Sequence, residues 1–251
     1  MRVLAGLPGS RGFESDWGMG LQTPANSSAM NFVFSYAGAN FNTNTLIAQA
    51  QAFFDHHNAA AAYSWWPSVP SHNRDLQTAL LKAGFQIGYS AAWMAADITI
   101  IPDSLVAWPH DYSLRVSRGP NPPYAEAWAK AYLSGYDLPE TISDGVRAFV
   151  AGLFTCEDPK LFIFALASAR QTIATALLYY FEETAGLYSI TVHPAWRGKG
   201  LGSRLTQSLL QFAHQAGCKT AVLQSSVAGR PVYLRLGFMQ TGAAPFYYLE
   251  P

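Results

Sequence analysis

The sequence predicts an α/β protein of the α+β kind, built from two similar halves. Apolar residues recur at helical spacing in some segments and form short strand-like runs in others, and the two kinds of segment alternate. Residues 161–168 and 171–181 are apolar runs joined by a tight turn, which predicts an antiparallel hairpin. Both halves also end with a short helix, a Gly-Phe pair and a last strand, at Gly84-Phe85 and Gly237-Phe238. This repeated order indicates an ancestral duplication.

The first half shows the alternation after a lead-in rich in Gly, Ser and Met. Residues 1–30 have no hydrophobic period, so we expect them to form a loop. The predicted elements that follow are a strand at 31–36, a helix at 46–56, a strand at 59–66, a short helix at 75–83 and a strand at 90–100. Residues 101–109 are predicted to be a linker, and we place the domain boundary between residues 105 and 106.

The second half contains the clearest helix of the chain. Its predicted elements are a strand at 112–116, helices at 124–132 and 141–154, strands at 161–168, 171–181 and 187–192, a helix at 202–216, a strand at 220–224, a short helix at 230–236 and a last strand at 246–249. Leu205, Leu209 and Phe212 form the buried stripe of the strongest helix, and Gly217 ends it.

Charge and composition exclude several classes of protein. The chain has 251 residues, with 16 Lys and Arg against 16 Asp and Glu, so no overall field attracts nucleic acid or an anionic membrane. Only 13% of its residues are charged, compared with roughly 25% in an average soluble protein. We therefore expect a ligand, a second domain or another subunit to cover part of the apolar surface, in a monomer or a homodimer.

The cysteines and the apolar segments predict a cytoplasmic location. Cys156 and Cys218 have no metal-ligand spacing, which predicts neither a metal site nor a disulfide framework and fits a reducing compartment. The start of the chain is too short and interrupted for a signal peptide. No segment approaches the roughly 18 apolar residues that span a bilayer.

A glycine-rich loop joins a predicted strand to the strongest predicted helix. Its residues are Arg197, Gly198, Lys199, Gly200, Leu201 and Gly202, followed by Ser203 and Arg204. Glycines let a backbone approach a ligand closely, and the free N–H groups of a helix N-terminus carry roughly half a positive charge. With the basic side chains around it, the loop predicts an anion site suited to a diphosphate.

Two other phosphate loops do not match this segment. The Walker pattern Gly-x-x-x-x-Gly-Lys-Ser/Thr is absent. A dinucleotide fold needs Gly-x-Gly-x-x-Gly and an acidic residue about 20 positions later. Here the glycine spacing differs, and residues 219–222 are Lys-Thr-Ala-Val.

Two motifs resemble one known family. Val192-x-Pro194-x-x-Arg197-Gly198-x-Gly200-x-Gly202 resembles the acyl-CoA signature of the GNAT N-acetyltransferase superfamily. The run 231–238 resembles its second signature, in which a tyrosine, here Tyr233, stands four residues before Gly-Phe. The resemblance implies a mixed, mostly antiparallel central sheet flanked by helices. It also implies a tandem of two such domains, a degenerate one at 1–105 and a catalytic one at 106–251.

The resemblance also implies acetyl-CoA as cofactor and a primary amine of a small molecule or peptide as acceptor. Main-chain groups of Ile190, Thr191 and Val192 would pair with the pantetheine arm. The amides of Gly198, Lys199, Gly200, Leu201, Gly202 and Ser203 would hold the pyrophosphate next to Arg197. Tyr233 would lie near the thioester sulfur. Ser226 stands where many members have an asparagine that contacts the cofactor.

The reaction that the resemblance implies also needs a base, an oxyanion donor and an acid. An alkyl amine has a pKa near ~10 and must lose a proton before it attacks a thioester. A backbone N–H of strand 187–192 is the expected oxyanion donor, and Tyr233 is the candidate acid. Where some members carry a glutamate, this sequence has Gly186. Glu183, beside Glu182 in the preceding turn, is the candidate base, with a solvated turn charge, Tyr188 or a water chain as alternatives.

The first half has no corresponding loop. Residues 37–44 contain one glycine and no basic residue, so we expect no CoA binding there by this mode. Trp65, Trp66 and Trp93 belong either to the core or to an acceptor pocket between the halves. A non-catalytic acyl-CoA-binding module is the alternative function.

Overall fold

The computed structural model describes residues 2–36, 42–55, 62–68, 73–101, 106–118, 124–169 and 171–250. The elements of the first half are α1 (Arg2–Ala5), β1 (Arg11–Glu14), β2 (Gly18–Gln22), β3 (Phe32–Ser35), α2 (Thr43–Phe54), β4 (Tyr63–Pro67), α3 (Arg74–Lys82) and β5 (Gln86–Asp97). Those of the second half are β6 (Tyr112–Ser117), α4 (Ala125–Tyr136), η3 (Glu140–Ile142), α5 (Ser143–Leu153), β7 (Leu161–Ser168), β8 (Gln171–Phe181), β9 (Thr184–Val192), η4 (Pro194–Trp196), α6 (Leu201–Gln215), β10 (Thr220–Ser225), α7 (Arg230–Arg235) and β11 (Met239–Leu249).

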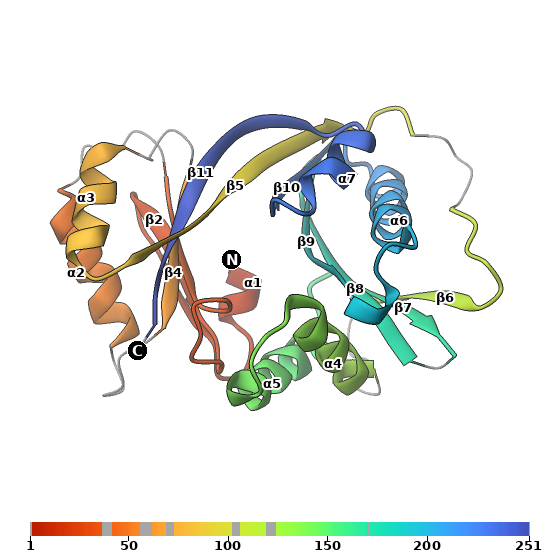
Figure 1. Cartoon of the computed structure of the whole chain (residues 1–251), viewed down its shortest axis with the longest axis horizontal. Coiled ribbons are helices and arrows are strands. Elements are labelled where there is room, and N and C mark those ends of the chain that lie inside the picture. Colours follow the sequence, from red (N-terminus) through yellow and green to blue (C-terminus); the bar gives the residue numbers. More distant parts are fainter. Residues whose placement is uncertain are drawn as a thin grey trace.

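All these strands belong to one sheet that runs through the molecule (Figure 1). Its order is β1-β2-β3-β4-β11-β5-β10-β9-β8-β7-β6. The β3–β4 and β9–β10 pairs are parallel, and the other neighbouring pairs are antiparallel. The mixed, mostly antiparallel sheet that the resemblance implied is therefore confirmed. None of the helices in the described part of the chain combines the length and apolarity needed to cross a membrane.

The two halves exchange their last strands. The order β3-α2-β4-α3-β5 in the first half matches β9-α6-β10-α7-β11 in the second. However, β5 pairs with β10 of the second half, and β11 pairs with β4 of the first. The two exchanged strands also pair with each other and form the long arch at the top of Figure 1. The sequence repeat is thus visible in the fold, and its two units share a continuous hydrogen-bond ladder.

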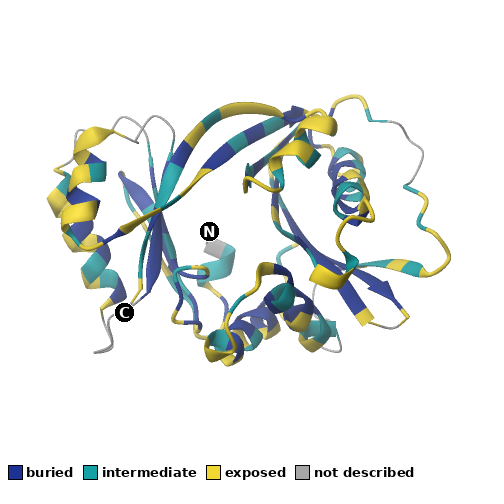
Figure 2. Cartoon of the chain, viewed as in Figure 1, coloured by how far each residue is buried: buried dark blue, intermediate teal, exposed yellow. Residues whose placement is uncertain are grey.

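Helices cover the sheet on different faces in the two halves (Figure 1). In the second half α6 packs on one face through Leu205, Leu209 and Ala213, each 0% exposed. On the other face, α4 and α5 bury an aromatic and aliphatic cluster around Trp128. In the first half α2 and α3 cover one face, above the fully buried Trp65. Figure 2 shows the resulting pattern of buried strands and helices with exposed outer faces.

Most predicted elements are confirmed, and the strands at 161–168 and 171–181 have the predicted bounds. The prediction of a loop over residues 1–30 is wrong, because this segment contains α1, β1 and β2. Glycine disfavours strands, so it hides the pattern of β2. At Gly20 a Cβ atom would lie 2.2 Å from the Phe13 ring, so the glycine lets that ring lie across the strand. Residues 102–105 of the predicted linker lie outside the described residues.

Candidate functional site

A bulge interrupts β9 near its carboxyl end. The β8–β9 register passes from Thr175–Thr191 to Leu177–Tyr188, so two residues of β9 oppose one of β8. Ser189 takes the left-handed conformation there, with φ 54°, and its carbonyl accepts a hydrogen bond from Thr175 Oγ1 at 3.0 Å. A bulge leaves main-chain groups without ladder partners and often lies next to an active site. This bulge includes Ile190 and adjoins Thr191, two residues expected to contact the cofactor.

The parallel strands β9 and β10 pair along only part of their length. Their register covers Thr184–Thr220, Ala185–Ala221 and Gly186–Val222. Beyond Gly186, the described residues of the two strands have no ladder partners in each other. The edge of β9 therefore opens toward its carboxyl end, where ligands commonly bind in open α/β sheets.

The glycine loop lies directly after this open edge. Gly198 and Gly200 have φ 78° and 73°, a conformation that favours glycine, and a Cβ on either would meet nothing within 4 Å. Gly200 is the N-cap of α6 and accepts a hydrogen bond from Arg204 N at 3.1 Å. Among the described residues, nothing accepts a hydrogen bond from the main-chain N–H groups of residues 200–203. The loop thus presents free donors at the positive end of a 15-residue helix and fits a diphosphate.

The basic side chains of the loop have different partners. Arg197 donates to the carbonyls of Val192 at 3.1 Å and Gly135 at 2.7 Å, which ties the loop to β9 and α4. Arg204 donates to Ala107 O at 2.8 Å. Lys199 lies over the Trp196 ring, with Nζ 4.6 Å from the centroid. Arg197 and Arg204 are therefore positioning residues that also add positive charge near the free amides.

The carboxyl end of α4 contributes two residues that the sequence patterns did not identify. A Cβ at Gly135 would lie 2.3 Å from Thr191 Oγ1, so only glycine allows α4 to lie this close to β9. Tyr136 donates from its hydroxyl to Ile190 O at 3.5 Å. The sequence predicted that this helix ends at residue 132, so both residues fell outside it, and the Gly-Tyr pair was the one signal that could have identified them.

Tyr233 lies on α7, with its ring edge-on to Phe238 at 5.8 Å between centroids. Burial raises the pKa of Tyr233 to about 12. Burial also raises the pKa of Tyr136 well above its usual value of 10, and the nearby phenols of Tyr132, Tyr233 and Tyr89 add to the shift. Both hydroxyls therefore stay protonated at neutral pH.

The space beside Gly186 is filled by a phenol. A Cβ built on Gly186 would lie 2.3 Å from the hydroxyl oxygen of Tyr188, so this tyrosine folds back across the glycine. A glutamate at this position would clash with it. Burial raises the pKa of Tyr188, and Tyr179 adds to the shift, so this phenol stays protonated at neutral pH.

The structure places Glu183 in the turn between β8 and β9. Its carboxylate pairs with Lys219 Nζ at 2.5 Å, and its carbonyl accepts from Lys219 N at 2.7 Å. Six residues of strand, about 20 Å, separate it from the bulge at Ser189. Glu182, the other acidic residue of the turn, is exposed and left-handed, with φ 51°. The structure therefore does not bring Glu183 to the bulge.

Ser226 lies in the turn between β10 and α7. Its hydroxyl oxygen accepts a hydrogen bond from Gly229 N at 3.1 Å, and its carbonyl accepts from Arg230 N at 3.1 Å. A hydroxyl group has one proton to donate besides its acceptor capacity. Ser226 therefore shapes the start of α7 and keeps a donor for a ligand.

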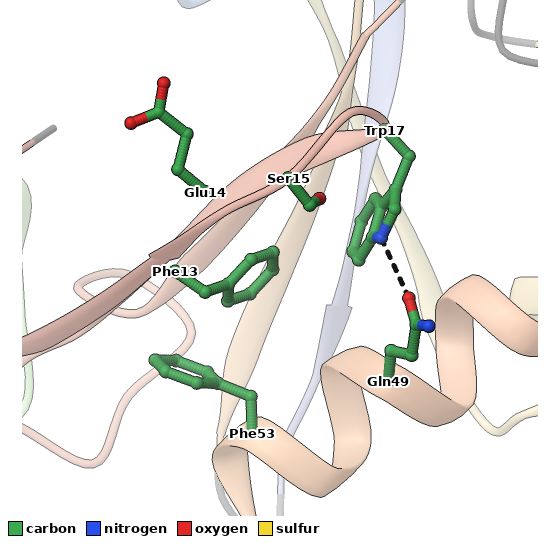
Figure 3. A pocket seen from close by; sticks show the side chains of 6 residues that line it. All are labelled: Phe13, Glu14, Ser15, Trp17, Gln49 and Phe53. Atoms are coloured by element: carbon green, nitrogen blue, oxygen red, sulfur yellow. Dashed lines mark hydrogen bonds between the residues drawn. The ribbon is translucent and has the colours of Figure 1, made fainter.

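A hollow of about 210 Å³ lies elsewhere, between β1, the turn that follows it and α2 (Figure 3). It is lined by Phe13, Glu14, Ser15, Trp17, Gln49 and Phe53. Trp17 Nε1 donates to Gln49 Oε1 at 2.9 Å across it. Because α2 and α6 lie at opposite ends of the molecule in Figure 1, this hollow is not part of the loop site. Within the described ranges, no group of three or more His, Cys, Asp or Glu residues could hold a metal ion.

Comparisons with known proteins agree with this geometry. Residues 125–238 match the model of the Acetyltransferase (GNAT) family. A glucosamine 6-phosphate N-acetyltransferase of Trypanosoma brucei brucei is 29% identical over 106 residues, which are 42% of this chain and 71% of that protein.

Two solved structures resemble the whole chain. A GCN5-related N-acetyltransferase from Kribbella flavida aligns over 100% of this chain and 92% of its own, with a TM-score of 0.67 and 16% identity. Another, from Sphaerobacter thermophilus, aligns over 94% and 81%, with a TM-score of 0.61 and 15% identity. At these identities the likeness shows the fold alone.

The fold and the site define an α/β protein with a split parallel strand pair and a helix N-terminus that presents free main-chain donors. Both sequence signatures, the glycine loop and the Tyr233 motif, lie within the matched segment 125–238. The GNAT acetyltransferase family is therefore shown for the C-terminal segment, residues 125–238. The whole length of the chain has a tandem GNAT-like arrangement.

Proposed function

We propose that this protein transfers an acetyl group from acetyl-CoA to a primary amine of a small molecule or a peptide. The observation that carries the proposal is the free first turn of α6, opened by the left-handed Gly198 and Gly200, in a GNAT-family segment. Bound acetyl-CoA supplies a thioester whose C–S bond breaks as the C–N bond forms, while the proton of the amine passes to the sulfur.

The residues that would hold the cofactor follow β9 and the loop. The amides of residues 198–203 hold the pyrophosphate, assisted by the positive charge of Arg197 and Lys199. The main chain of residues 190–192, freed from regular pairing by the bulge, contacts the pantetheine arm. Ser226 donates its remaining hydroxyl proton to the cofactor.

The proton path uses phenols and water. Tyr233 is the acid, because its raised pKa keeps the hydroxyl protonated at neutral pH. Tyr188 occupies the space beside Gly186 and orders water there by accepting and donating hydrogen bonds. Glu183 takes up a proton only through a longer chain of water molecules, because about 20 Å of strand separates it from the bulge.

The test is to mix the protein with acetyl-CoA and a panel of primary amines and to measure free CoA thiol. The panel includes alkyl amines, aromatic amines, a peptide with a free N-terminus and glucosamine 6-phosphate, the acceptor that the name of the trypanosomal relative states. Release of CoA that depends on an amine is the expected result.

A non-catalytic acyl-CoA-binding module is the second candidate. The observations that favour it are the missing carboxylate at Gly186 and the ion pair that Glu183 forms with Lys219. Calorimetry with CoA separates the two functions. Heat on titration with CoA, together with no release of CoA from acetyl-CoA in the presence of any amine, would support the binding module. No heat at all would contradict both proposed functions.

A further inference from the structure

Five aromatic side chains form a continuous surface on four neighbouring strands. They are Phe34 of β3, Trp66 of β4, Tyr89 and Trp93 of β5 and Phe246 of β11, and we call them the aromatic wall. Trp66 stacks on Phe246 with centroids 4.6 Å apart and planes at 11°, and Tyr89 meets Phe246 edge-on at 4.9 Å. Phe34 joins them through Trp66 at 6.2 Å and Trp93 at 6.4 Å.

The wall lies on the face of the sheet that α2 and α3 do not cover. Trp65 and Tyr247, which point to the covered face, are both 0% exposed. Their neighbours Trp66 and Phe246 point the other way and are only half-buried, and Tyr89 is 43% exposed. In Figure 1, α2 and α3 lie on the outer side of these strands, and the opposite side faces the C-terminal half.

The wall leads into the candidate site. In the β5–β10 ladder Trp93 pairs with Gln224, two residues before Ser226, so the wall ends beside the carboxyl end of β10. Tyr89 lies on the same strand as Trp93 and contacts Phe246 at the other end of the wall. The wall therefore reaches β10, the parallel partner of β9, whose open edge carries the proposed acyl transfer.

The chemistry of the wall is apolar and uncharged. The strands β3, β4 and β11 contain no Asp, Glu, Lys or Arg, and Asp97 of β5 lies at the strand end, bonded to Thr99. The Trp66 indole N–H is satisfied by Ser64 Oγ at 2.8 Å. The Tyr89 hydroxyl makes no hydrogen bond within the described part of the chain. A phosphate or carboxylate on a ligand would find no cationic donor on these strands.

We propose that the aromatic wall is the acceptor subsite, and that it selects a primary amine carried on an uncharged aromatic body, such as an arylalkylamine. The ring of the acceptor packs on Trp66, Phe246 and Trp93, which excludes water from both surfaces. Its alkylamine arm reaches past Trp93 toward the bulge of β9, where the new C–N bond forms. This inference rests on the proposed acetyl transfer and narrows its acceptor.

The first test compares three amines at saturating acetyl-CoA. The probes are 2-phenylethylamine, propylamine and glucosamine 6-phosphate. We expect kcat/KM for 2-phenylethylamine to exceed the other two by at least roughly tenfold, the factor that one good aromatic contact supplies. Equal or higher kcat/KM for propylamine or the sugar phosphate would overturn the proposal while leaving acetyl transfer established.

Variants locate the subsite on the wall. Phe246→Ala and Trp66→Ala are expected to raise KM for 2-phenylethylamine roughly tenfold, with little change in KM for propylamine or in CoA affinity. The matched control is Ile87→Ala, because Ile87 is 46% exposed on β5 but pairs with Tyr247 on the opposite face. An unchanged KM in folded Phe246→Ala and Trp66→Ala proteins would contradict the proposal.

A binding measurement tests the aromatic wall as an amine-binding surface without requiring turnover. Titrating 2-phenylethylamine into the CoA complex should quench tryptophan fluorescence, and Phe246→Ala should weaken that binding while Ile87→Ala leaves it intact. No quenching would overturn the aromatic subsite. If no amine caused release of CoA from acetyl-CoA, but 2-phenylethylamine still bound in a way that depended on the wall, the proposed catalysis would be overturned instead.

Discussion

At the scale of single residues, the proposed chemistry depends most on the hydroxyl of Tyr233. We expect Tyr233→Phe to lower kcat by roughly 10²-fold, the range of general acid catalysis, because the phenylalanine ring fills the same space but donates no proton. The Kd for CoA should stay within a factor of two or so, since the proposed pyrophosphate contacts come from the loop. Stopped-flow thiol release and calorimetry measure the two quantities. A folded variant with wild-type kcat would remove Tyr233 from the mechanism.

The raised pKa of Tyr233 also predicts the pH dependence. The neutral phenol is the form that the fold favours, so its contribution to stability is complete below pH ~10 and is lost as pH rises toward about 12. Activity should therefore rise with pH as the amine loses its proton, with no decline below pH 10 from ionisation of Tyr233. A pH–rate profile that falls between pH 8 and pH 9 in a protein still folded by circular dichroism would contradict this assignment.

At two glycines of the loop, the backbone conformation favours glycine although there is space for a larger side chain. Gly198 and Gly200 are left-handed with open surroundings, so alanine at either should cost about 1–2 kcal/mol through backbone strain and weaken CoA binding. Gly202→Ala is the matched control, because Gly202 is helical and an added Cβ would meet only Val192 at an ordinary 3.8 Å. Thermal unfolding should show loss of stability for the first two variants and none for the third.

At the scale of elements, Arg197 decides how the loop is held against its neighbours. Its guanidinium bridges the carbonyls of Val192 and Gly135, a two-pronged contact that lysine does not reproduce. We therefore expect Arg197→Lys to weaken CoA binding several-fold and to cost about 1 kcal/mol of stability. Lys199→Met, which removes a loop charge without breaking such a tie, should weaken binding with no loss of stability. If calorimetry showed wild-type CoA affinity for Arg197→Lys, Arg197 would act on CoA binding through its positive charge alone.

Elements with a strong local pattern could be predicted, and elements stabilised by distant partners could not. The helix at 201–215 has a complete buried stripe and a terminating glycine, so its bounds differ from the prediction by one residue at each end. The strand at 18–22 contains two glycines, and its pairing with β1 and β3 leaves no pattern in the local sequence. The last turn of α4, with Gly135 and Tyr136, was missed because its contacts are with β9, far away in sequence.

At the scale of the whole molecule, the exchange of β5 and β11 couples the two halves. We keep the boundary between residues 105 and 106 as the proposed limit of the two sequence repeats. A fragment of residues 106–251 would lack β5, the partner of both β10 and β11, and would leave their edges unpaired. Exposed strand edges promote aggregation.

The corresponding prediction is that neither fragment, 1–105 or 106–251, is a folded monomer alone, and that co-expressed fragments assemble into a complex that binds CoA. Size-exclusion chromatography, circular dichroism and calorimetry test it. The intact chain of 251 residues is the control. A monomeric, cooperatively unfolding fragment 106–251 with wild-type CoA affinity would contradict the coupling.

The sequence alone determined the α/β class, the repeated order of elements and the loop from Arg197 to Gly202, because each of these depends on spacing between nearby residues. Tertiary structure decided the rest. In the structure Tyr188 lies over Gly186, and Glu183 lies at the end of β9 that is remote from the bulge. Trp65 belongs to the core, whereas Trp66 lies on an open face of the sheet. Strand pairing between distant segments makes these choices, and no local pattern encodes which strand becomes the neighbour.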